Sequence, residues 1–247
     1  MFALLLRVRN ALLKRTRTAV GAVRGRDWRT GFPITRGIPL TRIGTRYGGW
    51  VVPDGVLNKH SICYCGGVGE DVSFDIGLIE KYNCAVYAFD PTPRAVNYVQ
   101  ENYSDYKGFH FSQIGLWDSD SVLKFFAPAN SEHVSHSIMN LHKSDEFFEA
   151  RCLRLSQIMN ENGHKQIDLL KLDIEGAEYK VIESLLYDRL NIKIICIEYD
   201  EAHTPIDDGF LTRIRESISS LIDSGYRLIA VDGCNYTFAL STKHSGH

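Results

Sequence analysis

In the segment Asp168-Leu-Leu-Lys-Leu-Asp-Ile-Glu-Gly-Ala-Glu178, an apolar run typical of a buried strand leads directly into carboxylates and a glycine. Charged groups are costly to bury, so acids at the end of a strand indicate a functional site rather than a core. Alternation along the strand places Lys171 and Asp173 on one face, where the lysine would neutralise the acid. We therefore predict that this strand ends at a site, with Asp173 and Glu175 in it, and that Glu178 serves there or only caps the next helix.

A glycine-rich loop lies upstream, in Cys65-Gly-Gly-Val-Gly-Glu-Asp71. It follows a predicted strand and precedes a predicted helix, the context in which such a loop holds a nucleoside-bearing ligand. Two carboxylates in the first helical turn would repel a pyrophosphate but suit a cationic amino or sulfonium group. The alternative is a tight turn followed by ordinary acidic helix-start residues. The expected cofactor-binding residues of this loop are Gly66, Gly67, Gly69, Glu70 and Asp71.

Two further strand ends carry candidate cofactor contacts. Asp90 ends Ala85-Val-Tyr-Ala-Phe-Asp90, about twenty residues beyond the glycine loop, the spacing at which a carboxylate meets a ribose diol. Trp117 could wall off a purine, and Asp118 could accept a hydrogen bond from its exocyclic amine. The alternatives are a solvated strand-end aspartate at position 90, and a core tryptophan with a turn aspartate at 117 and 118.

The next strand supplies two more catalytic candidates, since it ends in Cys196-Ile-Glu-Tyr-Asp-Glu-Ala-His203. In a parallel sheet Glu198 and His203 would lie beside Asp173, and the histidine could act as a general base or be an ordinary loop residue. No metal ligands are assigned, because the spacing of the histidines at 133, 136 and 142 matches no metal site. A metal held by Asp173, Glu175 and Glu198 is the alternative to a protein base.

Strand and helix patterns alternate from residue 61 onward, which predicts a parallel sheet covered on both faces. A last strand pair without an intervening helix is typical of the seven-stranded methyltransferase sheet, with the ligand at the carboxyl ends of the strands. Residues 28–60 are expected as an irregular lead-in and 128–149 as a loop with some helix. The expected strands are 61–67, 84–90, 108–117, 122–126, 167–173, 192–198, 225–231 and 236–240, and the expected helices 72–82, 93–103, 153–160, 177–190 and 211–224.

At Val86-Tyr-Ala-Phe-Asp-Pro-Thr-Pro93 and Leu170-Lys-Leu-Asp-Ile-Glu-Gly-Ala-Glu178, the chain resembles the FkbM family of S-adenosylmethionine-dependent methyltransferases. The resemblance covers roughly residues 47–240. It implies a class I, Rossmann-like domain with S-adenosylmethionine as cofactor. It also implies ribose binding by Asp90 and a place for Asp173 and Glu175 at the site of methyl transfer. Its members are usually O-methyltransferases of sugars, glycans or other small hydroxyl-bearing metabolites.

The glycine loop departs from the family pattern. That pattern has an acid two residues before the first glycine and a closing glycine; aligned on Gly69, these positions are Gly67 and Ser73. Glu70 and Asp71 could replace the missing acid. Two other classes stay open at this point. One is an NAD-dependent oxidoreductase or epimerase, for which neither the expected GxGxxG loop nor the expected Tyr-x-x-x-Lys pair is clear, and the other is a non-catalytic binding module.

Charge is distributed unevenly along the 247 residues, which are 44% hydrophobic and have a formal net charge of -2. Residues 1–50 hold 11 Lys and Arg and one acid, Asp27; the remainder has 17 basic against 29 acidic residues. An acidic body argues against nucleic-acid binding. We expect a basic N-terminal extension and lead-in over residues 1–46 and the methyltransferase domain over 47–247.

The cysteines and the apolar runs of the sequence bear on the cellular compartment in which the protein is expected. All six cysteines lie without a CxxC pair, mostly in apolar runs, which fits a reducing, cytoplasmic setting. No apolar run approaches the ~20 residues of a membrane span. The basic segment 1–27 could lie on an anionic membrane surface, serve as an organellar presequence, or be a solvated helix. The expected partner is a small-molecule or glycan acceptor; the oligomeric state is not predicted.

Overall fold

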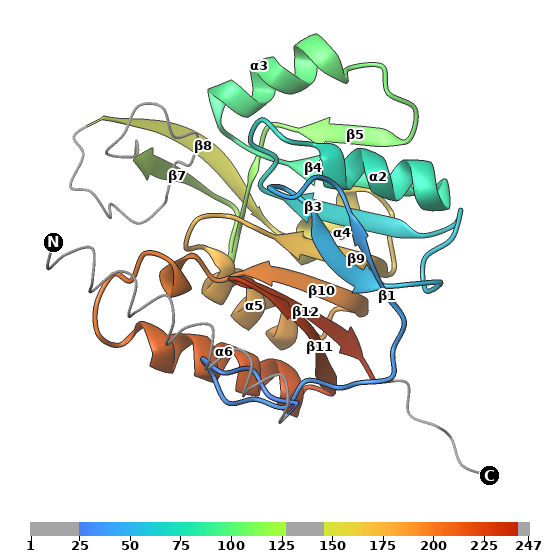
Figure 1. Ribbon diagram of the computed structural model, residues 1–247. Helices are drawn as coiled ribbons and strands as arrows, with labels where there is room; N and C mark the ends of the chain where they lie inside the picture. The colour runs from blue at the N-terminus through green and yellow to red at the C-terminus, as the bar shows by residue number, and fades with distance from the viewer. Residues whose placement is uncertain (1–24, 127–145, 242–247) are drawn as a thin grey trace, which may run out of the picture.

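The computed structural model describes residues 25–126 and 146–241. Its centre is a seven-stranded sheet of order β11-β12-β10-β9-β3-β4-β5 (Figure 1). Only β12 runs antiparallel to its neighbours, so the predicted closing antiparallel pair is confirmed. The strands are β3 (Ile62–Gly66), β4 (Ala85–Phe89), β5 (Phe109–Ser112), β9 (Ile167–Leu172), β10 (Ile192–Glu198), β11 (Tyr226–Asp232) and β12 (Asn235–Leu240).

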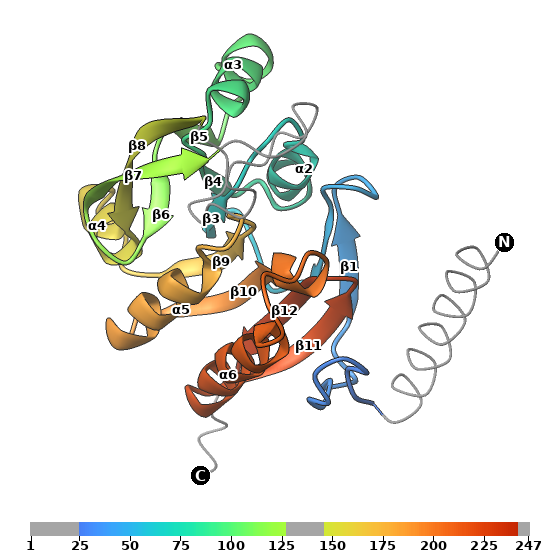
Figure 2. The ribbon, with the colours of Figure 1, turned by 90° about the vertical axis from the view of Figure 1, so that its left-hand side faces the viewer.

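Two apolar layers cover the sheet, because successive strand side chains point to opposite faces. Cys63 and Cys65 share the layer with α2 (Ser73–Tyr82) and α3 (Pro93–Asn102), as their alternation predicts. Tyr64 points into the other layer, which holds α4 (Leu155–Glu161), α5 (Glu178–Tyr187) and α6 (Phe210–Asp223). Figure 2 shows α5 and α6 on one side of the sheet and β1 on the other. The predicted class I arrangement with helices on both faces is confirmed.

A β-hairpin replaces part of the irregular lead-in expected over residues 28–60. Its strands are β1 (Leu40–Ile43) and β2 (Trp50–Pro53), paired antiparallel. Trp50 and Val52 are almost fully buried, and the Trp50 ring packs against Phe74 of α2 with centroids 6.3 Å apart. Thr237 of β12 donates a hydrogen bond to the carbonyl of Val51 at 2.7 Å. The hairpin therefore belongs to the core, and the domain boundary predicted between residues 46 and 47 falls in its turn.

A three-stranded sheet of order β6-β8-β7 accounts for two other differences from prediction. The strand predicted over 108–117 is two strands, because the chain leaves the main sheet after β5 and enters the small sheet as β6 (Gly115–Trp117). Close packing fixes this position: a side chain at Gly115 would meet Cys152 Sγ at 2.6 Å.

The central strand of the small sheet was also missed. It is β8 (Phe147–Arg154), which overlaps the predicted loop 128–149 and the first residues of the predicted helix 153–160. Glu149 and Arg151 lie on an exposed face of β8, and its partner β7 (Ser121–Phe126) is distant in sequence. The segment therefore has no local apolar pattern that would predict a strand.

Two segments named in the sequence analysis lie largely outside the described ranges: the basic segment 1–27 and the loop that contains the histidines at 133, 136 and 142. The predictions made for them stay predictions. No helix in the described part of the chain is both long and apolar enough to cross a bilayer.

Replacing Trp50 by alanine tests whether the hairpin is part of the core. We expect Trp50→Ala to lower the free energy of unfolding by about 3–5 kcal/mol, as for other buried aromatic truncations. Urea denaturation measures the change. The control Tyr187→Ala removes a ring that is 83% exposed and should cost under about 0.5 kcal/mol. Equal effects of the two substitutions would contradict a core role for the hairpin.

Candidate functional site

The glycine loop is pressed against the end of β9, and this contact explains why position 67 holds glycine. Gly67 has a φ of +78°, and a Cβ there would lie 1.7 Å from the carbonyl oxygen of Asp173. The amide of Asp173 donates to the carbonyl of Gly66 at 3.3 Å, and that of Gly67 to Phe89 at 2.9 Å. The ends of β3, β4 and β9 are thus held together at one edge of the sheet.

Asp90 holds the glycine loop in place. Its Oδ2 accepts hydrogen bonds from the amides of Val68 and Gly69 at 2.8 and 2.9 Å. Its Oδ1 accepts from the amide and the hydroxyl of Thr92 at 2.8 and 2.6 Å. Four donors from the chain itself use the accepting capacity of this carboxylate. Asp90 therefore shapes the loop that lines the site, and direct ribose binding by Asp90 stays a prediction.

Glu70 and Asp71 lie in the turn before α2, which begins at Ser73, rather than in its first turn as predicted, and both have partners within the chain. Glu70 forms an ion pair with Arg94 at 2.6 Å. Asp71 accepts from the hydroxyl of Thr45 at 2.7 Å and from the amide of Ser73 at 2.8 Å. Both line the cavity described below, and their proposed replacement of the family's loop acid stays a prediction.

A buried ion pair lies where β9 ends. Lys171, 4% exposed, contacts Asp173 with 3.0 Å between Nζ and Oδ2, and it also donates to the carbonyl of Gly67. Burial opposes the charged ammonium, but the negative charges of Asp173 and Asp75 outweigh it, so the pKa of Lys171 is raised. The Lys171–Asp173 pair predicted from strand alternation is confirmed.

Two acids at the end of β10 hold their protons more tightly than ordinary carboxyls. Burial, followed by the charge of Asp173, raises the pKa of Glu198 to about 8. Burial, followed by the charges of Glu178 and Glu175, raises the pKa of Asp200 to about 11. Asp200 Oδ2 is buried and has no hydrogen-bond partner among the described residues. Burial and the negative charges around them therefore favour the protonated form of both groups.

The loop after β9 is held from within by Glu178, whose side chain is buried. Its two carboxyl oxygens accept from the amides of Ile174 and Gly176, each at 2.9 Å. Between them Glu175 has a φ of +54°, an uncommon conformation for a residue with a side chain and one that is concentrated at functional sites. Glu178 thus caps this loop, and Glu175 is presented to the cavity.

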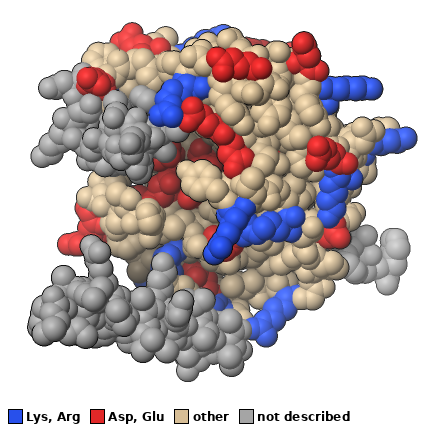
Figure 3. All heavy atoms as spheres, turned by 45° about the horizontal axis from the view of Figure 1, so that its top comes forward, with Lys and Arg blue, Asp and Glu red and all other residues tan. Residues whose placement is uncertain are grey.

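A cavity of about 750 Å³ joins these features, and acidic side chains gather in the hollow seen in Figure 3. Eight predicted site residues line it: Gly67, Gly69, Glu70, Asp71, Asp90, Asp173, Glu175 and Glu198. Lys171 is the only basic side chain among the described lining residues. Within the described ranges, no three histidine, cysteine or acidic side chains are arranged to hold a metal ion.

Four predicted site residues lie outside this lining. Gly66 is inside β3, where Leu116 and Ile174 fill the space next to it. Trp117 belongs to the small sheet, and the carbonyl of Asp118 accepts from Arg154 at 3.1 Å. His203 follows the short 3-10 helix η1 (Asp200–Ala202) rather than a strand end. Trp117 and Asp118 lie away from the cavity because the chain leaves the main sheet after β5. His203 lies outside the cavity lining because η1 comes between it and the end of β10.

Several lining residues were not predicted. They include Thr45, Tyr47 and Gly48 of the β1–β2 turn, Tyr98 and Tyr103 of the α3 region, Phe125 of β7, and Asp200. Only Asp200 had a usable signal, as a second acid two residues beyond Glu198. The others reach the cavity through tertiary packing of segments that carry no local motif.

Comparison with known proteins agrees with this arrangement. The sequence profile described as the methyltransferase FkbM domain matches residues 61–228, and the chain belongs to that family. It is therefore a methyltransferase domain with S-adenosylmethionine as cofactor, not an oxidoreductase domain.

Methyltransferase-like protein 24 of Homo sapiens is 30% identical over 134 residues, which are 54% of this chain and 30% of that protein. Its Rattus norvegicus counterpart is 27% identical over the same length. The match thus spans less than a third of these relatives.

Among solved structures, Aeropyrum pernix fibrillarin with natively bound S-adenosyl-L-methionine shares 9% identity, with 86% of each chain covered and a TM-score of 0.43. A Methanococcus jannaschii fibrillarin shares 12% identity, covering 75% of this chain and 69% of its own, also with a TM-score of 0.43. Likenesses this weak carry no inference, so the fold assignment rests on the strand order and the family.

The residues present fit the cofactor of the family. The glycine loop brings bare backbone to the cavity wall, which permits close approach of a ligand. The carboxyl groups of Asp173, Glu198 and Asp200 suit the sulfonium and amino groups that S-adenosylmethionine carries. The buried Asp200 oxygen without a partner is a further acceptor available to such a group.

Substitution of the two loop glycines tests the contact between the loop and β9. Gly67→Ala should lower the free energy of unfolding by at least about 3 kcal/mol, because its Cβ would collide with the Asp173 carbonyl. Gly69→Ala is the matched control: its φ is +56° but nothing lies within 4 Å, so only the conformational cost of about 1–2 kcal/mol is expected. Equal losses in urea denaturation would contradict the collision.

The raised pKa of Glu198 predicts a pH dependence of stability. Its folded pKa of about 8 lies above its ordinary 4.5, so the folded protein binds the proton more tightly than the unfolded chain. That stabilisation is complete below pH about 4.5 and is lost as pH rises through about 8.

We therefore expect the free energy of unfolding of the unmodified protein to fall between pH 5 and pH 9 by up to about 3 kcal/mol more than that of Glu198→Gln. Urea denaturation across this range measures both curves. Parallel curves would show that Glu198 titrates normally.

Proposed function

We propose that the protein is an S-adenosylmethionine-dependent O-methyltransferase whose acceptor is a hydroxyl group on a sugar, glycan or other small metabolite. The observation that carries the proposal is the Asp173 carboxylate, paired with a buried lysine and opening into the cavity beside Glu198. Alcohols are poor nucleophiles at neutral pH, so their methylation needs a nearby proton acceptor. A carboxylate held by a cation at the cavity wall supports that role.

The bound cofactor supplies an electrophilic methyl group. The chain's own residues hold the acceptor oxygen in line with it and exclude water, which accounts for most of the rate of such a displacement. Asp173 takes the hydroxyl proton as the new carbon–oxygen bond forms. The raised pKa of Glu198 favours its protonated form, which can donate a hydrogen bond within the cavity, so the two carboxyls have distinct roles.

Asp173 is favoured over His203 as the base. Asp173 lines the cavity and is fixed by Lys171 at 3.0 Å, whereas His203 lies outside the lining. A base must lie within hydrogen-bonding distance of the proton that it removes, so a residue outside the cavity lining is a weaker candidate whatever its basicity. The loop Asp173–Gly176, held by Glu178, keeps the base in one orientation.

The proposal is tested by titrating S-adenosylhomocysteine into the purified protein and into Asp173→Asn, followed by turnover with an acceptor found by screening. We expect both proteins to bind within about threefold of each other, because asparagine keeps the shape of the side chain. Turnover of Asp173→Asn should fall by about 10²-fold or more, as for loss of a general base.

Three outcomes would be informative against the proposal. Absence of binding would overturn the cofactor assignment for this chain. Binding with turnover preserved within a few-fold would remove Asp173 as the base. Retained binding with no turnover by the unmodified protein on any acceptor would favour a non-catalytic binding module.

A further inference from the structure

The turn between β1 and β2, residues 44–49, lies outside the family-matched segment 61–228 and yet forms part of the cavity wall. Thr45, Tyr47 and Gly48 line the same cavity as Asp173 and Glu198. None of these three positions belongs to the strands or loops that make the doubly wound sheet. The family profile therefore does not account for this wall.

The turn is held rigidly against the glycine loop. The hydroxyl of Thr45 donates to Asp71 at 2.7 Å and accepts from the amide of Gly48 at 3.0 Å. The amide of Thr45 donates to the hydroxyl of Ser73 at 2.9 Å. A Cβ at Gly48 would lie 2.7 Å from Asp71, so the turn fits closely against that carboxylate. A surface fixed in this way can contact a ligand without the cost of ordering a mobile loop.

The chain leaves this turn beside the proposed proton acceptor. Trp50 follows the turn directly, and its ring centroid lies 5.9 Å from Nζ of Lys171, which pairs with Asp173. The turn itself lies against Asp71 and Ser73, and through Trp50 the hairpin continues to the Lys171–Asp173 pair. In the proposed reaction the acceptor lies beside Asp173, in the same cavity that Thr45, Tyr47 and Gly48 line.

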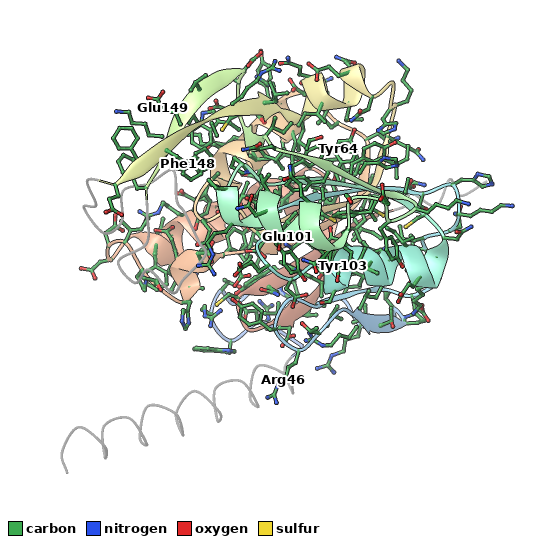
Figure 4. The ribbon with its side chains drawn as sticks, turned by 90° about the horizontal axis from the view of Figure 1, so that it is seen from above. Arg46, Tyr64, Glu101, Tyr103, Phe148 and Glu149 are labelled. Atoms are coloured by element: carbon green, nitrogen blue, oxygen red, sulfur yellow. The ribbon has the colours of Figure 1, made fainter. Side chains whose placement is uncertain are left out.

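Tyr47 is the unusual side chain of the turn, because it is 92% exposed while lining the cavity. Its neighbour Arg46 extends away from the body of the protein in Figure 4, and Tyr103 of the same cavity lies by α3. A tyrosine offers an apolar ring face together with a hydroxyl, and few torsions are lost when it is immobilised. Tyr47 is thus presented at the rim, ready to contact a bound molecule.

We propose that the 44–49 turn is the acceptor-selecting wall of the active site, and that Tyr47 packs its ring against the acceptor. This inference rests on the proposed function and adds a residue that sets its specificity. The acceptor class that fits is an uncharged, ring-shaped polyol, whose C–H face packs on the aromatic ring while its hydroxyls reach the carboxyls. An anionic acceptor would be repelled by the acids lining the cavity.

The test measures ligand binding to protein saturated with S-adenosylhomocysteine. The neutral probes are the methyl glycosides of glucose, mannose, galactose and rhamnose, and glucuronic acid is the anionic probe. Saturation-transfer NMR measures the binding of each probe. We expect at least one neutral glycoside to bind and glucuronic acid to bind far more weakly. Tyr47→Ala should lower the affinity for the neutral glycoside by about tenfold. Tyr47→Phe should lower it by less than about threefold, because phenylalanine retains the ring.

Tyr187→Ala is the matched control, since Tyr187 is also a highly exposed tyrosine but does not line the cavity. It should leave glycoside binding unchanged. Three results would overturn the inference: no neutral glycoside binds, glucuronic acid binds as tightly as the neutral sugars, or Tyr47→Ala binds like the unmodified protein.

Titration of the same variants with S-adenosylhomocysteine separates this inference from the proposed function. All of them should bind it within about twofold, because the Tyr47 side chain is 92% exposed and the contacts of the turn with the glycine-loop side are made by Thr45 and Gly48. If the unmodified protein does not bind S-adenosylhomocysteine, the proposed function itself fails. If it binds and methylates an acceptor that Tyr47→Ala also methylates with an unchanged KM, only the role of Tyr47 fails.

Discussion

The buried ammonium group of Lys171 is the constraint on which the site depends. A charge removed from water is tolerated only when partners surround it, and here three segments supply them. Asp173 provides the counter-charge, Gly67 a carbonyl oxygen, and Trp50 the face of its ring. The end of β9, the glycine loop and the N-terminal hairpin all meet at this group, so the contacts that pack this part of the core also position the site.

The excess of acids over bases at this edge of the sheet has a second consequence. Lys171 is the one basic residue among the described residues that line the cavity, and burial with the surrounding negative charges raises the pKa of Glu198 and Asp200. The buried Oδ2 of Asp200, which has no hydrogen-bond partner among the described residues, is an acceptor available to a cationic ligand. Asp173 is instead paired with Lys171, so neighbouring carboxyl groups of one cavity have different partners.

Much of the framework was accessible from the sequence, because near-continuous apolar strands and alternating helices are local signals. The Lys171–Asp173 pair followed from two-residue alternation, and the clustering of Asp90 with the glycine loop followed from parallel strand ends. The small sheet was not accessible: β8 pairs with β7 across a long stretch of chain and exposes charged residues on one face. The hairpin was missed because the burial of Trp50 depends on Phe74 and the sheet, which lie outside its own segment.

The sequence by itself determined the seven-stranded class, the edge of the sheet where the site lies, and the acids that gather there, because each of these depends on periodicity and spacing within single segments. Tertiary structure alone decided what those acids do. In the folded chain Asp90 accepts four hydrogen bonds from backbone and side-chain donors, and Asp71 accepts one from the hydroxyl of Thr45. Tyr47 lies at the rim of the cavity. Hydrogen-bond partners and burial are properties of segments brought together in space, and no local pattern records them.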